Sequence, residues 1–259
     1  MALASHVAPL RAPRSGSARR MRLDLEDGAR TTIHVAAYAT ASTELRVAVL
    51  RGQAKLEAWC AGQGVQEAIV GGFFARPHGT PLGEVRTRGV VREHVPFTAP
   101  FDGVRACVHV DGGVAAIAPR SALPATPRGD LLQAGPLLVR DGRPVFRREE
   151  DHEGFSAANG QFDSDITDGR YPRAAVGLAE DRMFAVAVDG RSRHDAGVTL
   201  EELAALMAAL GCHSAMNLDG GGSTSLISGG RLRNRPRAAY DVMEEGGRPI
   251  STALLFVPR

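Results

Sequence analysis

Segment 217–224 has the composition of a site that binds and transforms an anion. It reads Asn-Leu-Asp-Gly-Gly-Gly-Ser-Thr, so a carboxylate, an amide and two hydroxyls surround three consecutive glycines. Glycine runs are used where the backbone must approach another group closely or adopt a positive φ, and successive amides in such a turn can bind phosphate. We expect this segment to form an anion-binding site; a tight turn without a ligand is the alternative. The expected substrate contacts are Asn217, Gly220, Gly221, Gly222, Ser223 and Thr224.

Two common motifs that contain glycine and serine do not fit this segment. A phosphate-binding P-loop requires Lys directly before the Ser or Thr, and Gly222 occupies that place. The nucleophile elbow of serine hydrolases requires a glycine two residues after the serine, but Ser223 is followed by Thr224 and Ser225. Nucleotide triphosphate hydrolysis and a serine nucleophile are therefore disfavoured.

A second group of candidate residues lies at 188–191, which reads Val-Asp-Gly-Arg and ends an apolar run that begins at residue 183. Thr199 and Glu202 then form a capping box that predicts the start of a helix, and Gly211 is placed to end it. A second short strand is predicted at 214–218 and ends at Asp219. Strand, helix and strand at this spacing predict a βαβ unit with parallel strands.

The carboxyl ends of such parallel strands lie at one edge of the sheet, where ligands bind in open α/β folds. This arrangement would bring Asp189 and Arg191 close to Asn217 and Asp219. We therefore expect two carboxylates, an amide and a cation in one site.

The remaining elements are expected to form one domain around this unit. Runs at 21–25, 31–39 and 44–50 predict antiparallel strands, and 137–140 with the Asp141-Gly142 turn predicts a hairpin. The polar stretch 149–171 predicts a lid or binding loop. The predicted fold class is α/β or α+β, a mixed β-sheet with packed helices, an antiparallel N-terminal part and the βαβ unit in the C-terminal half. Residues 1–20 are predicted to be a flexible basic tail, and 21–259 the domain.

Composition limits the class of protein and its partners. Apolar residues make up 44% and charged residues 23% of the 259-residue chain, which is typical of a soluble globular protein. A net charge of only +2 argues against a nucleic-acid partner. No run predicts a signal peptide or a membrane span. Three widely spaced cysteines indicate reduced thiols, so we expect a cytoplasmic protein, and its oligomeric state is left open.

Six motifs, in order along residues 171–257, resemble the phosphodiester glycosidase family. They lie at 172–177, 188–191, 199–204, 217–224, 234–236 and 248–251, and segments 69–74 and 133–139 are also similar. The chain departs from the family pattern at Val70, where Asn is common, and at Gly247, where Glu is usual. The resemblance implies hydrolysis of a glycosyl 1-phosphodiester at the sugar side, with a sugar-phosphate substrate and no cofactor or metal.

The resemblance also implies roles for individual residues. The leaving phosphate needs cations and amides, and the anomeric carbon needs carboxylates that stabilise an oxocarbenium-like state or activate water. Asp189 and Asp219 form the implied carboxylate pair, and which one is the base is left open. The further implied substrate contacts are Arg173, Arg191, Arg248, Asn234, Gly71 and Gly72.

Two other functions remain open from the sequence. Val70 and Gly247 favour a non-catalytic module that binds a sugar phosphate or glycan. A metal-dependent phosphodiesterase with His194 and Asp195 as ligands is the third interpretation, although their spacing matches no recognised metal motif. Chelator sensitivity and the product formed would separate the three.

Overall fold

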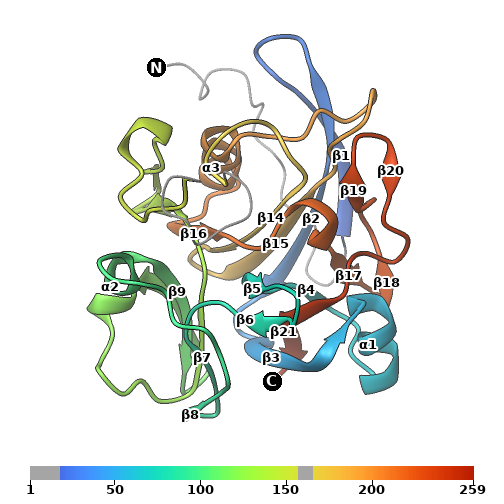
Figure 1. Cartoon of the computed structure of the whole chain (residues 1–259). Coiled ribbons are helices and arrows are strands. Elements are labelled where there is room, and N and C mark those ends of the chain that lie inside the picture. Colours follow the sequence, from blue (N-terminus) through green and yellow to red (C-terminus); the bar gives the residue numbers. More distant parts are fainter. Residues whose placement is uncertain (1–17, 157–165) are drawn as a thin grey trace.

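The structure, a computed structural model, describes residues 18–156 and 166–259 and consists mainly of curled antiparallel sheets (Figure 1). Strands make up 44% and helices 13%, so the predicted α/β or α+β class with packed helices is wrong. Within the described ranges, every ladder between named strands is antiparallel, and the predicted mixed sheet is absent there.

The largest sheet has seven strands in the order β1-β2-β15-β14-β16-β12-β13. In chain order these strands are β1 (Ala18–Asp24), β2 (Arg30–Ala39), β12 (Leu137–Arg140), β13 (Arg143–Pro144), β14 (Arg173–Leu178), β15 (Arg182–Val188) and β16 (Ser214–Asn217). Strands from distant parts of the chain thus pair in one sheet. Because β1 begins at Ala18, residues 18–20 of the predicted tail are part of the sheet; residues 1–17 lie outside the described ranges.

The predicted βαβ unit is wrong because β14 lies between its two strands. β15 and β16 each pair antiparallel with β14, so they run in the same direction but are not neighbours. The strand–helix–strand spacing does not reveal the position of β14, because β14 comes before β15 in the chain. A tight hairpin after β14 places it beside β15, on the side where β16 then pairs. The carboxyl ends of β15 and β16 still reach one edge: Val188 pairs with Arg173, and Asn217 pairs with Ala175.

Helix α3 (Leu200–Ala209) packs against one face of this sheet, in contact with β12, β13, β14 and β16 (Figure 1). The predicted capping box is confirmed, since the Thr199 hydroxyl accepts from the Glu202 amide and the Glu202 carboxylate accepts from the Thr199 amide. Gly211 has a φ of 85°, as expected after a helix end. A Cβ at Gly177 would lie 2.5 Å from Cys212 Sγ, so this glycine lets the segment after α3 pack closely on β14.

The opposite face packs against two five-stranded sheets and shares a large apolar core with them. One sheet has the order β18-β17-β4-β21-β3, and the other β10-β9-β11-β7-β8. The strands of the first are β3 (Thr43–Ala54), β4 (Ala68–Val70), β17 (Leu226–Ser228), β18 (Arg231–Leu232) and β21 (Ile250–Pro258). Those of the second are β7 (Val85–Thr87), β8 (Val90–Val91), β9 (Ala106–Asp111), β10 (Val114–Pro119) and β11 (Asp130–Gln133).

Short elements complete the described chain. They are the pairs β5 (Phe74–Ala75) with β6 (Thr80–Pro81) and β19 (Arg237–Ala239) with β20 (Val242–Met243), the helices α1 (Leu56–Gln63) and α2 (Phe101–Val104), and the 3₁₀ turns η2 (Arg120–Ala122), η3 (Arg148–Glu150) and η5 (Gly221–Ser223). The predicted 137–140 hairpin is confirmed as β12 and β13.

Two further predictions concern loops and thiols. The predicted lid at 149–171 falls partly on residues 157–165, which lie outside the described ranges, so its role stays a prediction. The three cysteines are free and buried, as the sequence indicated. None of the helices in the described ranges has the length and apolar character needed to cross a membrane.

Candidate active site

The candidate site lies at the edge of the seven-stranded sheet where β15 and β16 end and β14 begins. There the chain passes through Asp189, Arg173 and Asn217. The Asp219 amide donates to the Gly71 carbonyl at 3.0 Å, which joins this edge to the end of β4 in the neighbouring sheet. The residues that the sequence predicted to share one edge do so, although the sheet that forms the edge is antiparallel.

The three glycines of the turn are explained by close approaches from three directions. A Cβ at Gly220 would lie 2.8 Å from the Pro172 carbonyl oxygen. At Gly221, which has a φ of 59°, it would lie 3.2 Å from Arg191 Nη1, and at Gly222 it would lie 3.1 Å from Arg248 Nη2. Side chains here would push the two arginines away, so the glycines allow both guanidinium groups to lie against the turn.

Most backbone amides of this turn are already used within the protein. The Gly220 amide donates to Asp219 Oδ1 at 2.9 Å, and the Gly221 amide donates to the Pro172 carbonyl at 2.9 Å. The Ser223 amide donates to the Gly220 carbonyl at 3.1 Å, because the segment tightens into the 3₁₀ turn η5. An anion at this place would therefore be bound mainly by the arginine side chains rather than by free backbone amides.

Arg191 and Arg248 provide unneutralised positive charge at the turn. Arg191 Nη1 donates to the carbonyls of Arg237 and Ala238 at 3.1 and 2.7 Å, and within the described ranges neither Arg191 nor Arg248 forms an ion pair with a carboxylate. Burial lowers the pKa of Arg191, and the nearby charge of Arg248 lowers it further. Two like charges held close together, neither of them in an ion pair with a described carboxylate, favour a bound anion.

Asp219 is a carboxylate close enough to Arg248 to feel its charge. The residue is partly exposed, but its carboxyl group is enclosed by its neighbours, and loss of water raises its pKa to about 6. The Ser223 hydroxyl, the Gly220 amide, Arg248 and Arg76 act in the opposite direction and favour its charged form. A carboxylate with a pKa near neutrality suits proton transfer or charge stabilisation at a reaction centre.

Four buried polar atoms around the same turn have no hydrogen-bond partner among the described residues. They are Asn217 Oδ1, Ser223 Oγ, Thr224 Oγ1 and Ser225 Oγ. The Ser223 hydroxyl is near enough to Asp219 to affect its titration, but it does not meet hydrogen-bond geometry. Buried polar groups are normally satisfied, so this concentration of unused groups is typical of a place where water or a ligand binds.

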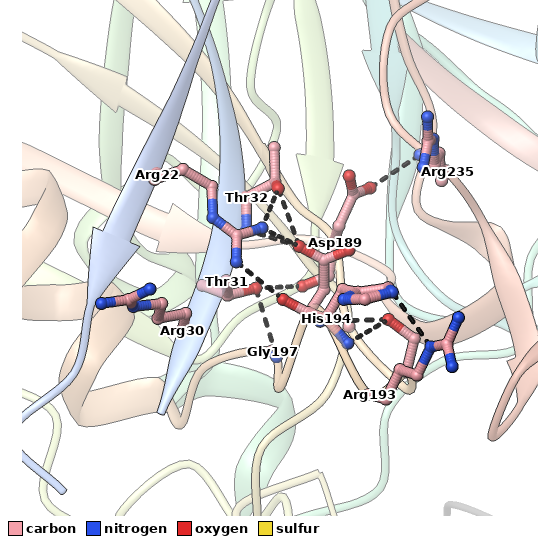
Figure 2. Close-up of polar contacts among 12 residues, drawn as sticks. Arg22, Arg30, Thr31, Thr32, Asp189, Arg193, His194, Gly197 and Arg235 are labelled. Atoms are coloured by element: carbon pink, nitrogen blue, oxygen red, sulfur yellow. Dashed lines mark hydrogen bonds and ion pairs between the residues drawn. The ribbon is translucent and has the colours of Figure 1, made fainter. Parts of the chain in front are cut away.

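Asp189 has a different environment from Asp219. It is 2% exposed, and its two carboxylate oxygens are both bonded. Oδ1 accepts from the Arg235 amide at 2.6 Å (Figure 2). Oδ2 lies 3.0 Å from His34 Nε2. Its main-chain carbonyl also accepts from the Thr31 hydroxyl at 2.6 Å. Asp189 thus has no oxygen without a protein partner.

Several predicted substrate residues are engaged in supporting the turn. Asn234 accepts from the Leu226 amide and donates to the Thr224 carbonyl, and Asn217 Nδ2 donates to the Gly135 carbonyl. The Gly71 and Gly72 amides donate to the Thr252 carbonyl and hydroxyl.

Arg173, Val70 and Gly247 lie close to the residues that support the turn. Val70 and Gly247 are the two positions that depart from the family pattern. The Arg173 side chain is buried, donates to the carbonyls of Val198 and Gly169, and has its guanidinium 5.3 Å from the Tyr171 ring centre. Val70 is buried in β4, directly before the glycine pair. A Cβ at Gly247 would lie 2.6 Å from Ser225 Oγ.

The histidine and aspartate considered as metal ligands have other partners. Asp195 Oδ1 accepts from the Thr32 amide and hydroxyl and from Arg22 Nη1, while His194 contacts Arg193 at the surface (Figure 2). Across 18–156 and 166–259, no group of three His, Cys, Asp or Glu side chains is placed to hold a metal ion.

Three residues around the site were not predicted from the sequence. Tyr171 lies with its ring centre 5.3 Å from the guanidinium groups of both Arg173 and Arg191. His34 bonds Asp189 across 155 residues of sequence, and Arg76 acts electrostatically on Asp219. Tyr171 directly precedes the motif at 172–177, and Arg76 lies two residues after the similar segment 69–74. Nothing in the sequence connects His34 with the site.

Similarity to known proteins extends over most of the chain. The family described as phosphodiester glycosidase matches residues 63–257. The catalytic domain of zebrafish N-acetylglucosamine-1-phosphodiester alpha-N-acetylglucosaminidase, auto-inhibited by its pro-peptide, has a similar fold: TM-score 0.71 and 19% identity, covering 94% of this chain and 83% of that one. A hypothetical protein from Synechocystis gives a TM-score of 0.66 and 19% identity, covering 93% of this chain and 62% of that one.

One curated relative is similar over a short stretch. The SPbeta prophage-derived uncharacterized protein YomE of Bacillus subtilis is 36% identical over 66 residues, which is 25% of this chain and 10% of that protein. The present chain therefore corresponds to a small part of that relative. At 19% identity, the structural matches show a shared fold alone.

Proposed function

Because the chain belongs to the phosphodiester glycosidase family, we propose that it hydrolyses a glycosyl 1-phosphodiester at the sugar side and releases free sugar and a phosphomonoester. The observation that carries this proposal is the position of Asp219, an enclosed carboxylate beside Arg248, at a turn that also contacts Arg191. The zebrafish protein, N-acetylglucosamine-1-phosphodiester alpha-N-acetylglucosaminidase, is named for action on a sugar 1-phosphodiester.

In this proposal the phosphodiester lies against Arg191 and Arg248, which stabilise the negative charge that develops on the leaving phosphate. Asp219 in its ionised form lies at the anomeric carbon, where it stabilises the oxocarbenium-like transition state or activates water. A phosphate monoester leaves without full protonation, so one carboxylate is sufficient. Asn217, Ser223 and Thr224 offer unused polar atoms for the sugar hydroxyls or the water.

A product assay tests the proposal. The purified protein is incubated with a panel of sugar 1-phosphodiesters that differ in the sugar and in the group beyond the phosphate, and free sugar and sugar 1-phosphate are measured separately. We expect free sugar and a phosphomonoester in equal amounts from at least one substrate. Release of sugar 1-phosphate would instead indicate a phosphodiesterase, and binding without turnover would indicate a binding module.

The pH dependence should follow the ionisation of Asp219. Because the charged form is the reactive one in this proposal and burial raises the pKa of Asp219 to about 6, kcat/KM should reach a plateau above that pH. Below it, kcat/KM should fall about tenfold for each pH unit, since the fraction of ionised carboxylate falls tenfold. Initial rates across the acidic and neutral range measure this. Activity that falls as the pH rises through the pKa of Asp219 would mean that its protonated form is required.

A further inference from the structure

Asp189 connects the segment that carries Arg191 to two other parts of the chain. Its amide donates to the Thr32 carbonyl at 2.9 Å, and its carboxylate reaches His34 on the same strand, β2. The carboxylate also accepts from the Arg235 amide ahead of β19 (Figure 2). Both residues of the pair are buried, Asp189 at 2% and His34 at 4% exposure. The pair is therefore shielded from solvent.

The segment that follows Arg235 fixes both the backbone and the side chain of Arg191. Arg237 Nη1 donates to the Gly190 carbonyl at 3.1 Å, and the Asp241 amide donates to the Arg191 carbonyl at 2.7 Å. The Arg191 guanidinium donates to the carbonyls of Arg237 and Ala238. Arg191 also has a φ of 56°, an unfavourable value for a residue with a side chain, which persists only when the surroundings enforce it.

From these contacts we infer that Asp189 is a positioning residue, which with His34 fixes Arg191 against the glycine turn, and that its carboxylate does not react with substrate. The expected changes in kcat and KM rest on the proposed function. The inference differs from the two-carboxylate mechanism implied by the family resemblance, because it leaves Asp219 as the reacting carboxylate.

The chemistry of the pair allows a test that separates positioning from reaction. An amide side chain at this position keeps one oxygen, which can accept from the Arg235 amide, and gains an NH₂ group, which can donate to His34 Nε2 when the imidazole proton is on Nδ1. Asp189→Asn therefore removes the charge but preserves both contacts. Asp189→Ala removes both contacts.

Steady-state kinetics and inorganic phosphate binding by calorimetry are measured for both variants. We expect Asp189→Asn to lower kcat by less than about tenfold, and Asp189→Ala to raise KM and the Kd for phosphate by at least about tenfold. Asp130→Ala is the matched control, since Asp130 is also buried and accepts from two backbone amides, those of Val47 and Arg88, but lies on β11. It should lower stability without weakening phosphate binding. Intact mass must exclude deamidation, to which an Asn-Gly sequence is prone.

Three outcomes would overturn the inference. A loss of kcat of about 10³-fold in folded Asp189→Asn, with phosphate binding retained, would make Asp189 a reacting carboxylate. If Asp189→Ala binds phosphate with wild-type affinity, Asp189 does not position Arg191. If Asp189→Ala does not fold, the kcat of Asp189→Asn decides whether Asp189 reacts with substrate. If the wild-type protein shows no turnover, the proposed function is refuted, and the positioning role is then judged from phosphate binding alone. If the wild-type protein also fails to bind phosphate, the inference is refuted as well.

Discussion

Asp219→Asn should lower kcat by at least about 10³-fold while leaving the fold intact, because it removes the only charge available at the anomeric carbon in the proposed mechanism. The amide side chain retains an oxygen that accepts from the Gly220 amide, so the turn should keep its shape. Affinity for inorganic phosphate should be unchanged or higher, since a negative charge beside the anion is lost. Single-turnover kinetics, calorimetric phosphate binding and thermal melting measure the three effects.

Asp219→Ala is the second variant of this test, because an asparagine directly before Gly220 could deamidate back to aspartate. Both variants should be equally inactive when the asparagine protein is intact by mass. Wild-type turnover in the folded Asp219→Asn variant would show that Asp219 only shapes the glycine turn. The proposed mechanism would then lose its reacting group, whatever substrate the enzyme accepts.

Arg248→Ala should lower kcat/KM by about 10²-fold to 10³-fold, the usual cost of removing a group that stabilises charge in the transition state. It should also move the acidic limb of the pH profile upward, because Arg248 favours the ionised form of Asp219 and its loss raises the pKa of that carboxyl further. The two effects are read from one set of initial rates across pH. The second effect would not arise from a general loss of stability.

Arg182→Ala is the matched control for Arg248→Ala. Arg182 begins β15 at the end opposite the site and forms a surface ion pair with Asp181. Its removal should change kcat/KM by less than about twofold, because exposed ion pairs contribute little. An Arg248→Ala enzyme with the wild-type pH profile and rate would contradict the proposed phosphate site.

Features that depend on neighbouring residues could be predicted from the sequence. The Thr199 capping box, the end of α3 before Gly211 and the β12 to β13 hairpin follow from contacts within a few residues, and the structure has each of them. The ordered motifs, which include the glycine run after Asp219, likewise identified the family. Local chemistry is sufficient for these features because its partners are close in sequence.

By contrast, the order of strands in the sheet and the partners of each site residue are decided only in the folded chain. The insertion of β14 between β15 and β16 is a choice of strand partner, and it turned an expected parallel unit into an antiparallel sheet. The two aspartates look alike in sequence, but Asp189 is bonded to His34, 155 residues away, while Asp219 lies among Ser223, Arg248 and Arg76. Burial and partners brought from distant segments set the charge and reactivity of a carboxylate, so its role depends on the packed fold.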